Sequence, residues 1–482
     1  PTTTRGDIVF RNASTNTRLA ASTAGYHLQT NGAASDPTYV GFVQSGSGAA
    51  TRTWNNKASE VVSVKDFGAV GDTKVITGTT SISSGSAALT LSGAGFTSGD
   101  VGKKIYVPGA GSAGATLATT ILSYTSSTQV TLNANASTTL SSVSKQVTWG
   151  TDDTSAVQAA ITSLSSGGRV LFPRGGYLIT TQIDIAVSGV ALIGEGRGAT
   201  KIASAASGHT FQIGTGLYYT EVRDMQITRA AYPATSGQNG IHFTNLTERA
   251  LVENVEVTYH YVGIRCGITS FSKVVNALCD NNYSHGMHVT NADAAGGLQW
   301  TIINPLVQRN DGYGILYNSP SGNAAVGELI NPSTYANKLG GLWFVGTDSS
   351  HALNAIRIRG GFAGEDGSHG IYFDTYGTAT CRVTGTYTEA AGTAACGVNQ
   401  STSATNVGGG LRATANNTAV EFLDCHAIGH SYSGIATNAA RTLITGCGAR
   451  TNGAAAVGGE TSGITINAGN ATVTGCSSKA NA

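Results

Sequence analysis

Glu365 and Glu389 are the residues of this 482-residue sequence best suited to acid–base chemistry. Cleavage of a glycosidic bond commonly uses two carboxyl groups about 5–9.5 Å apart, one as acid and one as base or nucleophile. Glu365 lies five residues after Gly360, and Glu389 lies four residues after Gly385. These two glycines occupy equivalent positions in successive repeats of the sequence, which are described below. We therefore expect neighbouring coils of the fold to bring the two glutamates together on one tight turn. Asp366 is a third candidate, although its position carries Asn in other repeats.

His288, Trp343 and Tyr372 are candidate substrate-binding residues, because they fall on one outward column of the same repeat. Exposed aromatic rings suit stacking on the apolar faces of sugars, but large exposed aromatic residues also cover sheets or meet another subunit. Arg357 belongs to a second candidate surface, formed by the residues three before each repeat anchor. These residues form either a surface ion-pair ladder, a binding site for an acidic sugar or part of a lyase site. This surface contains Thr301, Glu328, Arg357, Arg382 and Glu421.

The seven cysteines all follow residue 265, and three of them stand one residue after a repeat position. Such spacing indicates a stack of small buried thiols, which needs no disulfide partner. No His or Cys lies around them at the spacing of metal ligands. We therefore predict neither a metal site nor a cofactor.

These candidates depend on a repeat that begins near residue 240, in which a glycine precedes two apolar residues separated by one other residue. Alternation within each phrase predicts a strand, and recurrence every 20–30 residues predicts the coils of a solenoid. The phrase glycines are residues 240, 263, 286, 314, 341, 370, 397, 434 and 463.

A second series of anchor residues alternates with these phrases. The residue two before each anchor is apolar throughout, and the residue six after it is usually Asn, which predicts an Asn ladder inside a turn. The anchors are Asn254, Asn276, Asn304, Asn331, Gly360, Gly385, Asp424, Gly446 and Gly475. The ladder positions are Asn282, Asn310, Asn337, Asp366, His430, Asn452 and Asn481.

Two strands and a third segment per coil predict an all-β chain folded as a right-handed parallel β-helix. The composition agrees, because 65 glycines and only 11% charged residues favour strands and turns over exposed helices. The net charge of +1 and the lack of a basic run argue against nucleic-acid binding. No apolar stretch reaches the about 18 residues of a membrane span. From each phrase glycine to the next anchor the spacing varies, which predicts insertions in one turn, the longest from Gln400 to about residue 417.

Two phrases precede the repeat, Val64-Lys-Asp-Phe-Gly-Ala-Val-Gly-Asp72 and Thr151-Asp-Asp-Thr-Ser-Ala-Val-Gln-Ala-Ala-Ile161. The second predicts an amphipathic helix whose first free amides Thr151 or Asp152 can satisfy, and which could cap the solenoid core. Together the phrases resemble the opening of the pectate-lyase-like superfamily, which phage tailspikes share. The segment Arg5–Asn12, followed by residues 28–32 with the hairpin signal Asn31-Gly32, resembles the start of phage tail fibres.

The predicted organisation is a virion-attachment segment at 1–60, a β-helix start at 61–72 and 151–239, an inserted β-module at 73–150, and β-helix coils at 240–482. In the inserted module, residues 88–91, 104–107 and 129–132 alternate as strands do. A spacer is favoured over a sugar-binding role for this module.

The resemblance implies a homotrimeric phage tailspike, held to the tail or baseplate by its N-terminus and acting outside the cell on host surface polysaccharide. Glu365 and Glu389 would hydrolyse that polysaccharide, with Asp366 beside them. Two alternatives stay open: an adhesin of the same fold that only binds glycan, and a polysaccharide lyase.

Overall fold

The computed structural model describes residues 5–479, except residues 6, 13, 23, 32–34, 293–295, 368, 377–379, 390–410, 415–416, 431–433, 451–462 and 468. The phrase at Gly397, residues 400–410 of the predicted insertion, and the ladder positions Asn452 and Asn481 lie outside the described residues. The rest of the predicted insertion is wrong, because Leu411–Ala413 form strand β38, which pairs in register with the Ile371–Phe373 phrase of the preceding coil. The phrase strand of this coil therefore follows residue 410 and not Gly397. The chain divides into two compact units, Pro1–Val62 and Ser63–Ala482.

The first unit consists of short hairpins and one turn of helix. Strand β1 (Ile8–Arg11) pairs with β2 (Asn16–Leu19), and β3 (His27–Gln29) pairs with β4 (Thr38–Val40), both antiparallel. Helix α1 (Trp54–Ala58) carries an indole that stacks on His27, with ring centroids 5.3 Å apart. The hairpin signal at Asn31 falls between β3 and β4, as predicted.

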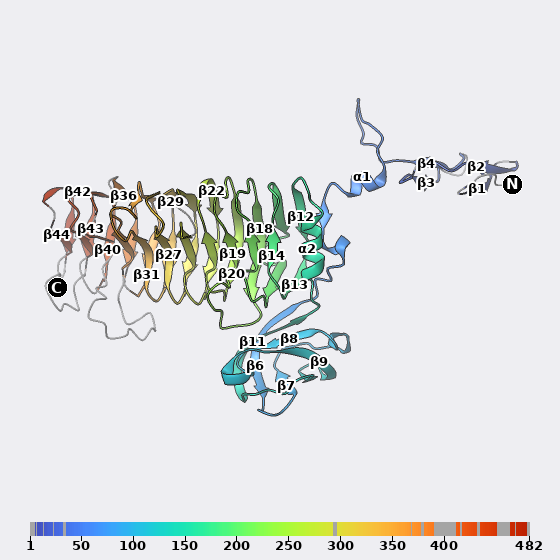
Figure 1. Ribbon diagram of the computed structural model, residues 1–482, viewed down its shortest axis with the longest axis horizontal. Helices are drawn as coiled ribbons and strands as arrows, with labels where there is room; N and C mark the ends of the chain where they lie inside the picture. Colours follow the sequence, from blue (N-terminus) through green and yellow to red (C-terminus); the bar gives the residue numbers. More distant parts are fainter. Residues whose placement is uncertain are drawn as a thin grey trace. The chain divides into compact units, whose positions relative to one another are not determined.

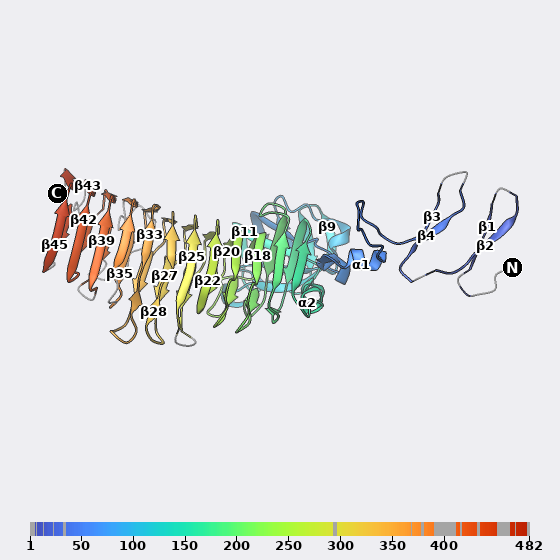
Figure 2. The ribbon, with the colours of Figure 1, turned by 90° about the horizontal axis from the view of Figure 1, so that it is seen from above.

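The second unit is a right-handed parallel β-helix, whose coils stack so that corresponding strands lie side by side (Figures 1 and 2). Each coil contributes one strand to each of three parallel sheets, which we number in the order that the chain meets them after the variable turn. Sheet 1 contains β12 (Gly168–Phe172), β15 (Val190–Gly194), the first parts of β18 (Glu221–Arg229) and β20 (Leu251–Thr258), β22 (Thr269–Val275), β25 (Leu298–Ile303), β29 (Glu328–Ile330), β33 (Arg357–Arg359), β36 (Cys381–Thr384), β39 (Ala419–Leu423), β42 (Arg441–Thr445) and β45 (Asn470–Thr474). Sheet 2 contains β13 (Gly175–Ile179), β16 (Thr200–Ser204), the later parts of β18 and β20, β23 (Leu278–Asp280), β26 (Leu306–Gln308), β30 (Ser333–Tyr335), β34 (Phe362–Gly364), β37 (Tyr387–Glu389), β40 (His426–Ile428), β43 (Gly448–Arg450) and β46 (Ser477–Lys479). Sheet 3 contains β14 (Ile183–Ile185), β17 (Phe211–Ile213), β19 (Ile241–Phe243), β21 (Ile264–Cys266), β24 (Met287–Thr290), β27 (Tyr313–Asn318), β31 (Gly340–Val345), β35 (Ile371–Asp374), β38 (Leu411–Ala413), β41 (Ile435–Thr437) and β44 (Ile464–Ile466).

The anchor residues form the corner between sheets 1 and 2. Every one of them has a positive φ, from 48° at Asn304 to 68° at Gly446. This left-handed conformation turns the chain within one residue, and Asn, Asp and Gly are the residues that adopt it most easily. The corner therefore explains why the anchor column contains only these three residue types.

The Asn ladder lies inside the corner between sheets 2 and 3, as predicted. The backbone N–H groups of Asn282, Asn310 and Asn337 each donate to the side-chain oxygen of the next ladder residue, at 2.9–3.1 Å. Their amide groups also donate to carbonyls of the preceding coil, such as Val307 at 2.9 Å. The ladder thus satisfies backbone groups that no sheet pairs.

Helix α2 (Thr154–Thr162) caps the first coil with four buried residues, Ala156, Val157, Ala160 and Ile161. The side chain of Asp152 accepts the N–H of Thr154 at 3.1 Å, which confirms one of the two predicted caps. Asp153 instead accepts the N–H groups of Val70 and Gly71, at 2.6 and 3.2 Å. These hydrogen bonds join the two phrases, residues 64–72 and 151–161, which the inserted module separates in the sequence.

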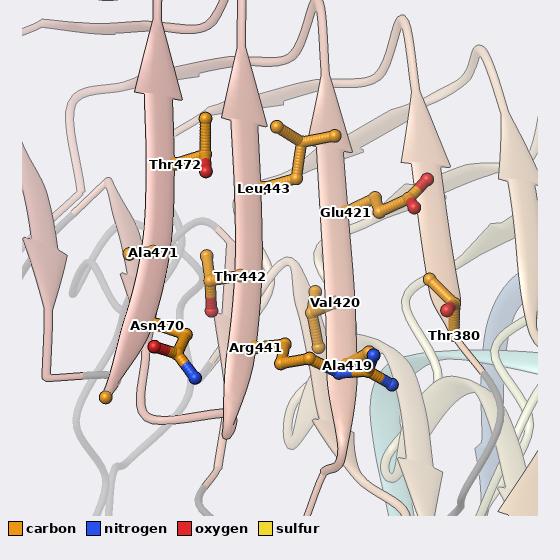
Figure 3. A pocket seen from close by; sticks show the side chains of 11 residues that line it. Thr380, Ala419, Val420, Glu421, Arg441, Thr442, Leu443, Asn470, Ala471 and Thr472 are labelled. Atoms are coloured by element: carbon orange, nitrogen blue, oxygen red, sulfur yellow. The ribbon is translucent and has the colours of Figure 1, made fainter.

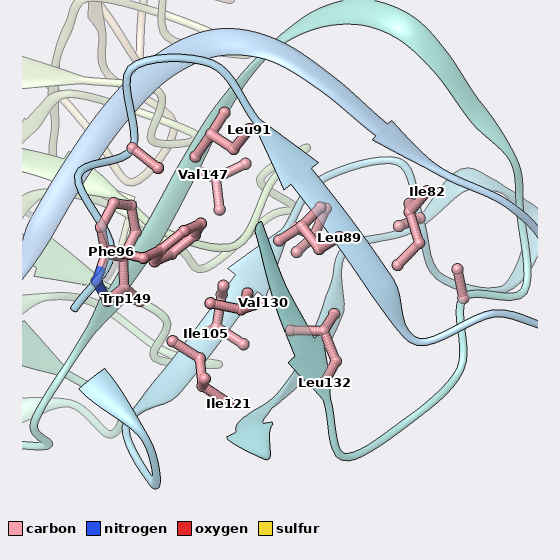
Figure 4. Packing of buried hydrophobic residues seen from close by; sticks show 14 of the residues in the cluster. Ile82, Leu89, Leu91, Phe96, Ile105, Ile121, Val130, Leu132, Val147 and Trp149 are labelled. Atoms are coloured by element: carbon pink, nitrogen blue, oxygen red, sulfur yellow. The ribbon is translucent and has the colours of Figure 1, made fainter. Parts of the chain in front are cut away.

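The inserted module is a closed, six-stranded antiparallel barrel made of β6 (Lys74–Ile82), β7 (Ala88–Leu91), β8 (Lys104–Val107), β9 (Leu117–Ser126), β10 (Gln129–Leu132) and β11 (Leu140–Gly150). Strands β7, β8 and β10 have the predicted bounds. Its own apolar core includes Phe96 and Trp149, whose ring centroids are 4.6 Å apart (Figure 4). Hydrogen bonds between Gln146 and Tyr232 join the barrel to the β-helix.

Candidate functional site

Glu365 and Glu389 lie on neighbouring coils at the edge of sheet 2. The N–H of Glu365 donates to the carbonyl of Glu389 at 3.0 Å, so the backbone adjacency expected for this pair is present. Glu365 occupies a corner with φ 50° and is half-buried, and Glu389 is exposed at the end of β37. The Tyr335 hydroxyl donates to Glu365 Oε2 at 2.6 Å. Burial, and then the charge of Glu389, raise the pKa of the Tyr387 hydroxyl.

An aromatic pair stands on the same face of sheet 2. The rings of Phe362 and Tyr387 stack with centroids 5.8 Å apart and planes 13° from parallel. The Phe362 ring covers Gly364, where a Cβ atom would come within 2.3 Å of it. Gly364 pairs in register with Tyr335 on one side and with Glu389 on the other. The two carboxylates therefore border an apolar surface made by this pair.

Asp366 lies inside the coil and is fully buried. Its Oδ1 accepts the backbone and side-chain N–H groups of Asn337, both at 2.9 Å, and its Oδ2 accepts the Thr334 hydroxyl at 2.9 Å. Burial raises the pKa of this carboxyl to about 7, against the lowering effect of these hydrogen bonds. Because the carboxyl faces the interior of the ladder, we leave Asp366 out of the proposed catalytic pair.

His288, Trp343 and Tyr372 lie on sheet 3 in a continuous stack of rings. Trp343 packs between Tyr313, at 4.6 Å, and Tyr372, at 4.1 Å, with planes within 25° of parallel. His285 extends the stack, since it lies 5.5 Å from Tyr313 and 5.4 Å from His288. Tyr313 and Tyr372 therefore occupy the faces of the Trp343 ring, whereas His288 meets His285 edge-on.

Four histidines of sheet 3 and its border are neutral at pH 7. Burial lowers the pKa of His209 and His288 to about 4 and that of His242 and His285 to about 3. Arg265, which lies in the same column as His242 and His288, lowers the pKa of both further. These four imidazoles therefore add no positive charge to this part of the surface, and its charge comes from Arg265.

Arg357 lies on a different surface, the outer face of sheet 1, where four adjoining hollows form one groove. Three of the hollows share Arg357, and the fourth adjoins them at Thr380. Small residues, such as Ala355, Thr380 and Ala419, line its floor and leave room for the hollows. At its far end Glu421 and Arg441 project from β39 and β42 beside Thr380 and Asn470 (Figure 3).

The charged residues of the groove are only partly paired. Arg359 Nε lies 2.7 Å from Glu328 Oε1, and Arg382 Nε lies 2.5 Å from Glu421 Oε2. Among the described residues, no carboxylate forms an ion pair with Arg357 or with Arg441. The groove thus has two arginines beyond what its own glutamates neutralise.

The predicted site residues lie on three surfaces and not in one site. Glu365 and Glu389 border sheet 2, the ring stack covers sheet 3, and Arg357 lies in the sheet 1 groove. Three groove residues, Phe271, Gln299 and Arg441, were missed by the sequence analysis. A signal for them exists, because the residues five before successive anchors form the floor of the groove: Phe271, Gln299, Val326, Ala355, Thr380, Ala419, Arg441 and Asn470.

Within the described part of the chain, no group of three His, Cys, Asp or Glu side chains is placed to hold a metal ion. The same residues include no helix with the length and apolar character needed to cross a membrane.

Residues 147–347 match the family model of rhamnogalacturonase A/epimerase, pectate lyase-like. These residues include α2 and the coils from β12 to β31, so the match covers the first half of the β-helix. No curated protein matches the sequence.

Several solved structures are similar to this chain at 14% identity. One is ORF18 of Geobacillus virus E2, with a TM-score of 0.43 over 88% of this chain and 62% of that one. Another is the Agl-KA catalytic domain, with a TM-score of 0.48 over 86% and 85%. The Dettilon tailspike protein gp208 has a TM-score of 0.41 over 67% and 65%. This chain thus spans less than two thirds of the Geobacillus virus E2 protein.

Proposed function

We propose that this protein binds a bacterial surface polysaccharide along the groove of sheet 1. The observation that carries the proposal is the continuity of the four hollows from β22 to β45. These strands are seven steps apart in the sheet, which at about 4.8 Å per step is roughly 34 Å. An open groove of this length suits an extended polymer better than a small molecule, which enclosed pockets bind.

The lining of the groove supports a glycan as the polymer. Amide, hydroxyl and guanidinium groups alternate along it, including Gln299, Thr301, Thr380 and Arg441. Such groups hydrogen-bond to the hydroxyl groups of sugars. The pectate-lyase-like family model and the two opening phrases support the same class of ligand.

We further propose that Glu365 and Glu389 hydrolyse a polysaccharide chain at the edge of sheet 2, on a surface separate from the groove. In this reaction one carboxyl protonates the leaving glycosidic oxygen, while the other carboxylate activates a water molecule or attacks the sugar carbon. The placement of both on neighbouring coils, beside the Phe362–Tyr387 pair, favours this role. A sugar-binding role for His288, Trp343 and Tyr372 stays a prediction.

The biological setting that we propose is a phage tail. Residues 1–60 would attach the protein to the tail or baseplate, the protein would act as a homotrimer, and the β-helix would bind the host outside the cell. The resemblance of residues 5–32 and of the two opening phrases to tail fibres and tailspikes supports this setting.

The test is to incubate the purified protein with capsule and lipopolysaccharide extracts, and to measure both binding and the release of reducing ends. We expect binding and release by the wild type, and we expect Glu365→Gln and Glu389→Gln to keep binding but lose release. Glu253→Gln is the matched control on sheet 1 outside the hollows. Binding without any release would indicate an adhesin, and an unsaturated uronate product would indicate a lyase. Full release by both variants would contradict the assignment of the pair.

A further inference from the structure

We infer that the hollow between Phe271 and Arg357 is a subsite for an acidic sugar, so that the groove selects polysaccharides that carry carboxylates. This inference rests on the proposed function, because it assumes that the groove binds a polysaccharide. The hollow has a volume of about 310 Å³ and spans strands β22 to β33.

Phe271 supplies an exposed ring at one end of the hollow. Its side chain is 69% exposed, and no other aromatic ring among the described residues stacks on it. The register of β22 against β25 shifts between Thr269 and Ser272, and Phe271 has φ 62° at this bulge. Bulges of this kind re-aim a side chain, and a bulky residue rarely adopts positive φ without a reason. The bulge therefore presents an open ring face, which the occupied faces of the sheet 3 stack do not.

Arg357 supplies the charge at the other end. It is exposed, and none of the described carboxylates pairs with it. Glu328 lines the same hollow, but Arg359 lies 2.7 Å from it and neutralises it. Lys273, on the same strand as Phe271, adds a second positive charge at the edge. The hollow thus presents a net positive charge beside an apolar ring.

This combination matches the chemistry of a uronic acid. The flat face of the sugar ring stacks on Phe271, and the guanidinium of Arg357 forms a forked pair of hydrogen bonds with the carboxylate. The Gln299 amide and the Thr301 hydroxyl face the same hollow and can bond to the sugar hydroxyls. A neutral sugar would leave the guanidinium without a partner, which is the basis of selection.

The test measures retention of the full chain on three immobilised uronate polymers, alginate, hyaluronan and polygalacturonate, with neutral dextran as the reference. We expect stronger retention on at least one uronate polymer than on dextran, and weakening of that retention as salt rises. On the polymer retained best, Arg357→Gln should lower affinity at least tenfold, and Arg357→Lys should recover only part of it. Phe271→Ala should also lower affinity, because it removes the stacking face.

Arg169→Gln is the matched control, since Arg169 lies on β12 in the same outward column but outside the hollows. Retention equal to dextran on all three uronate polymers, or unchanged affinity in Arg357→Gln, would overturn the inference. In that case binding of a neutral surface glycan would leave the proposed function standing, whereas binding of no polysaccharide would remove both. The surface could instead be covered by a second copy of this chain, which light scattering of Arg357→Gln tests by measuring the oligomeric mass. A smaller oligomer than that of the wild type would mean that a second copy covers this surface, and would overturn the inference.

Discussion

The Asp366 carboxyl accepts the backbone N–H of Asn337 at 2.9 Å, so an acid occupies a position that asparagine fills in three preceding coils. The ladder needs an acceptor at this point, which both residue types provide. The carboxyl differs in having a proton to lose, and its burial makes that loss unfavourable.

We predict that Asp366→Asn makes stability less dependent on pH. Between about pH 4, where an aspartate in the unfolded chain loses its proton, and about pH 7, the folded chain keeps the proton. The free energy of unfolding therefore falls as pH rises through this window. Asp366→Asn should remove the fall and raise stability at pH 8 by about 2 kcal/mol, in the range for a buried polar group. Urea unfolding at pH 5 and pH 8 measures this. Asp184→Asn, on the outer surface, should keep the wild-type slope, and a slope that persists in Asp366→Asn would contradict the prediction.

We predict that His285 destabilises the protein in acid. Its Nδ1 accepts the N–H of Tyr313 at 3.0 Å, a bond that requires the neutral ring, and burial lowers its pKa to about 3. Below about pH 6.5 the unfolded chain takes up a proton that the folded chain does not, so stability falls as pH falls. His285→Asn keeps an acceptor without the titration and should reduce the loss of melting temperature between pH 7 and pH 4.5. His351→Gln is the control, and an equal loss in both variants would refute the idea.

We predict that the ring stack of sheet 3 is a source of stability. Trp343 packs against Tyr313 and Tyr372 on its two faces, so Trp343→Ala should lower the free energy of unfolding by about 3–5 kcal/mol. Trp343→Phe keeps a ring in the stack and should lose about half of that or less. Denaturant unfolding distinguishes them. Similar losses in the two variants would mean that the volume of the indole matters and the stacking does not.

We predict that Tyr232→Phe loosens the barrel from the β-helix. The Tyr232 hydroxyl donates to the Gln146 carbonyl and accepts the Gln146 N–H, both at 3.1 Å. Removing the hydroxyl leaves both backbone groups without this partner, at about 1–3 kcal/mol. Hydrogen exchange should quicken at β11, and the barrel core around Phe96 should stay protected. Unchanged exchange at Gln146 would show that other contacts hold the barrel.

The coils could be predicted from the sequence because their signals are local. A left-handed corner needs Asn, Asp or Gly, and a buried strand position needs an apolar residue. The residue types of Asn304 and Ile302 therefore suffice to predict a corner and an inward strand position. The outer surfaces have no such requirement. That Trp343 has both faces covered, or that Arg359 neutralises Glu328, depends on how neighbouring coils place their side chains. The spacing places Phe271 five residues before an anchor, but the bulge and the positive φ that expose its ring become visible only in the folded chain.

The entry and exit of the barrel have a consequence for how this chain can be rebuilt. Lys74 and Trp149 face each other on β6 and β11, and a Cβ atom on Gly150 would lie 2.3 Å from the Thr73 hydroxyl oxygen. The chain therefore leaves the β-helix and returns to it at almost the same point. A splice of residue 73 to residue 150 through a short turn would excise the whole barrel, and a foreign domain with adjacent termini could be grafted in its place.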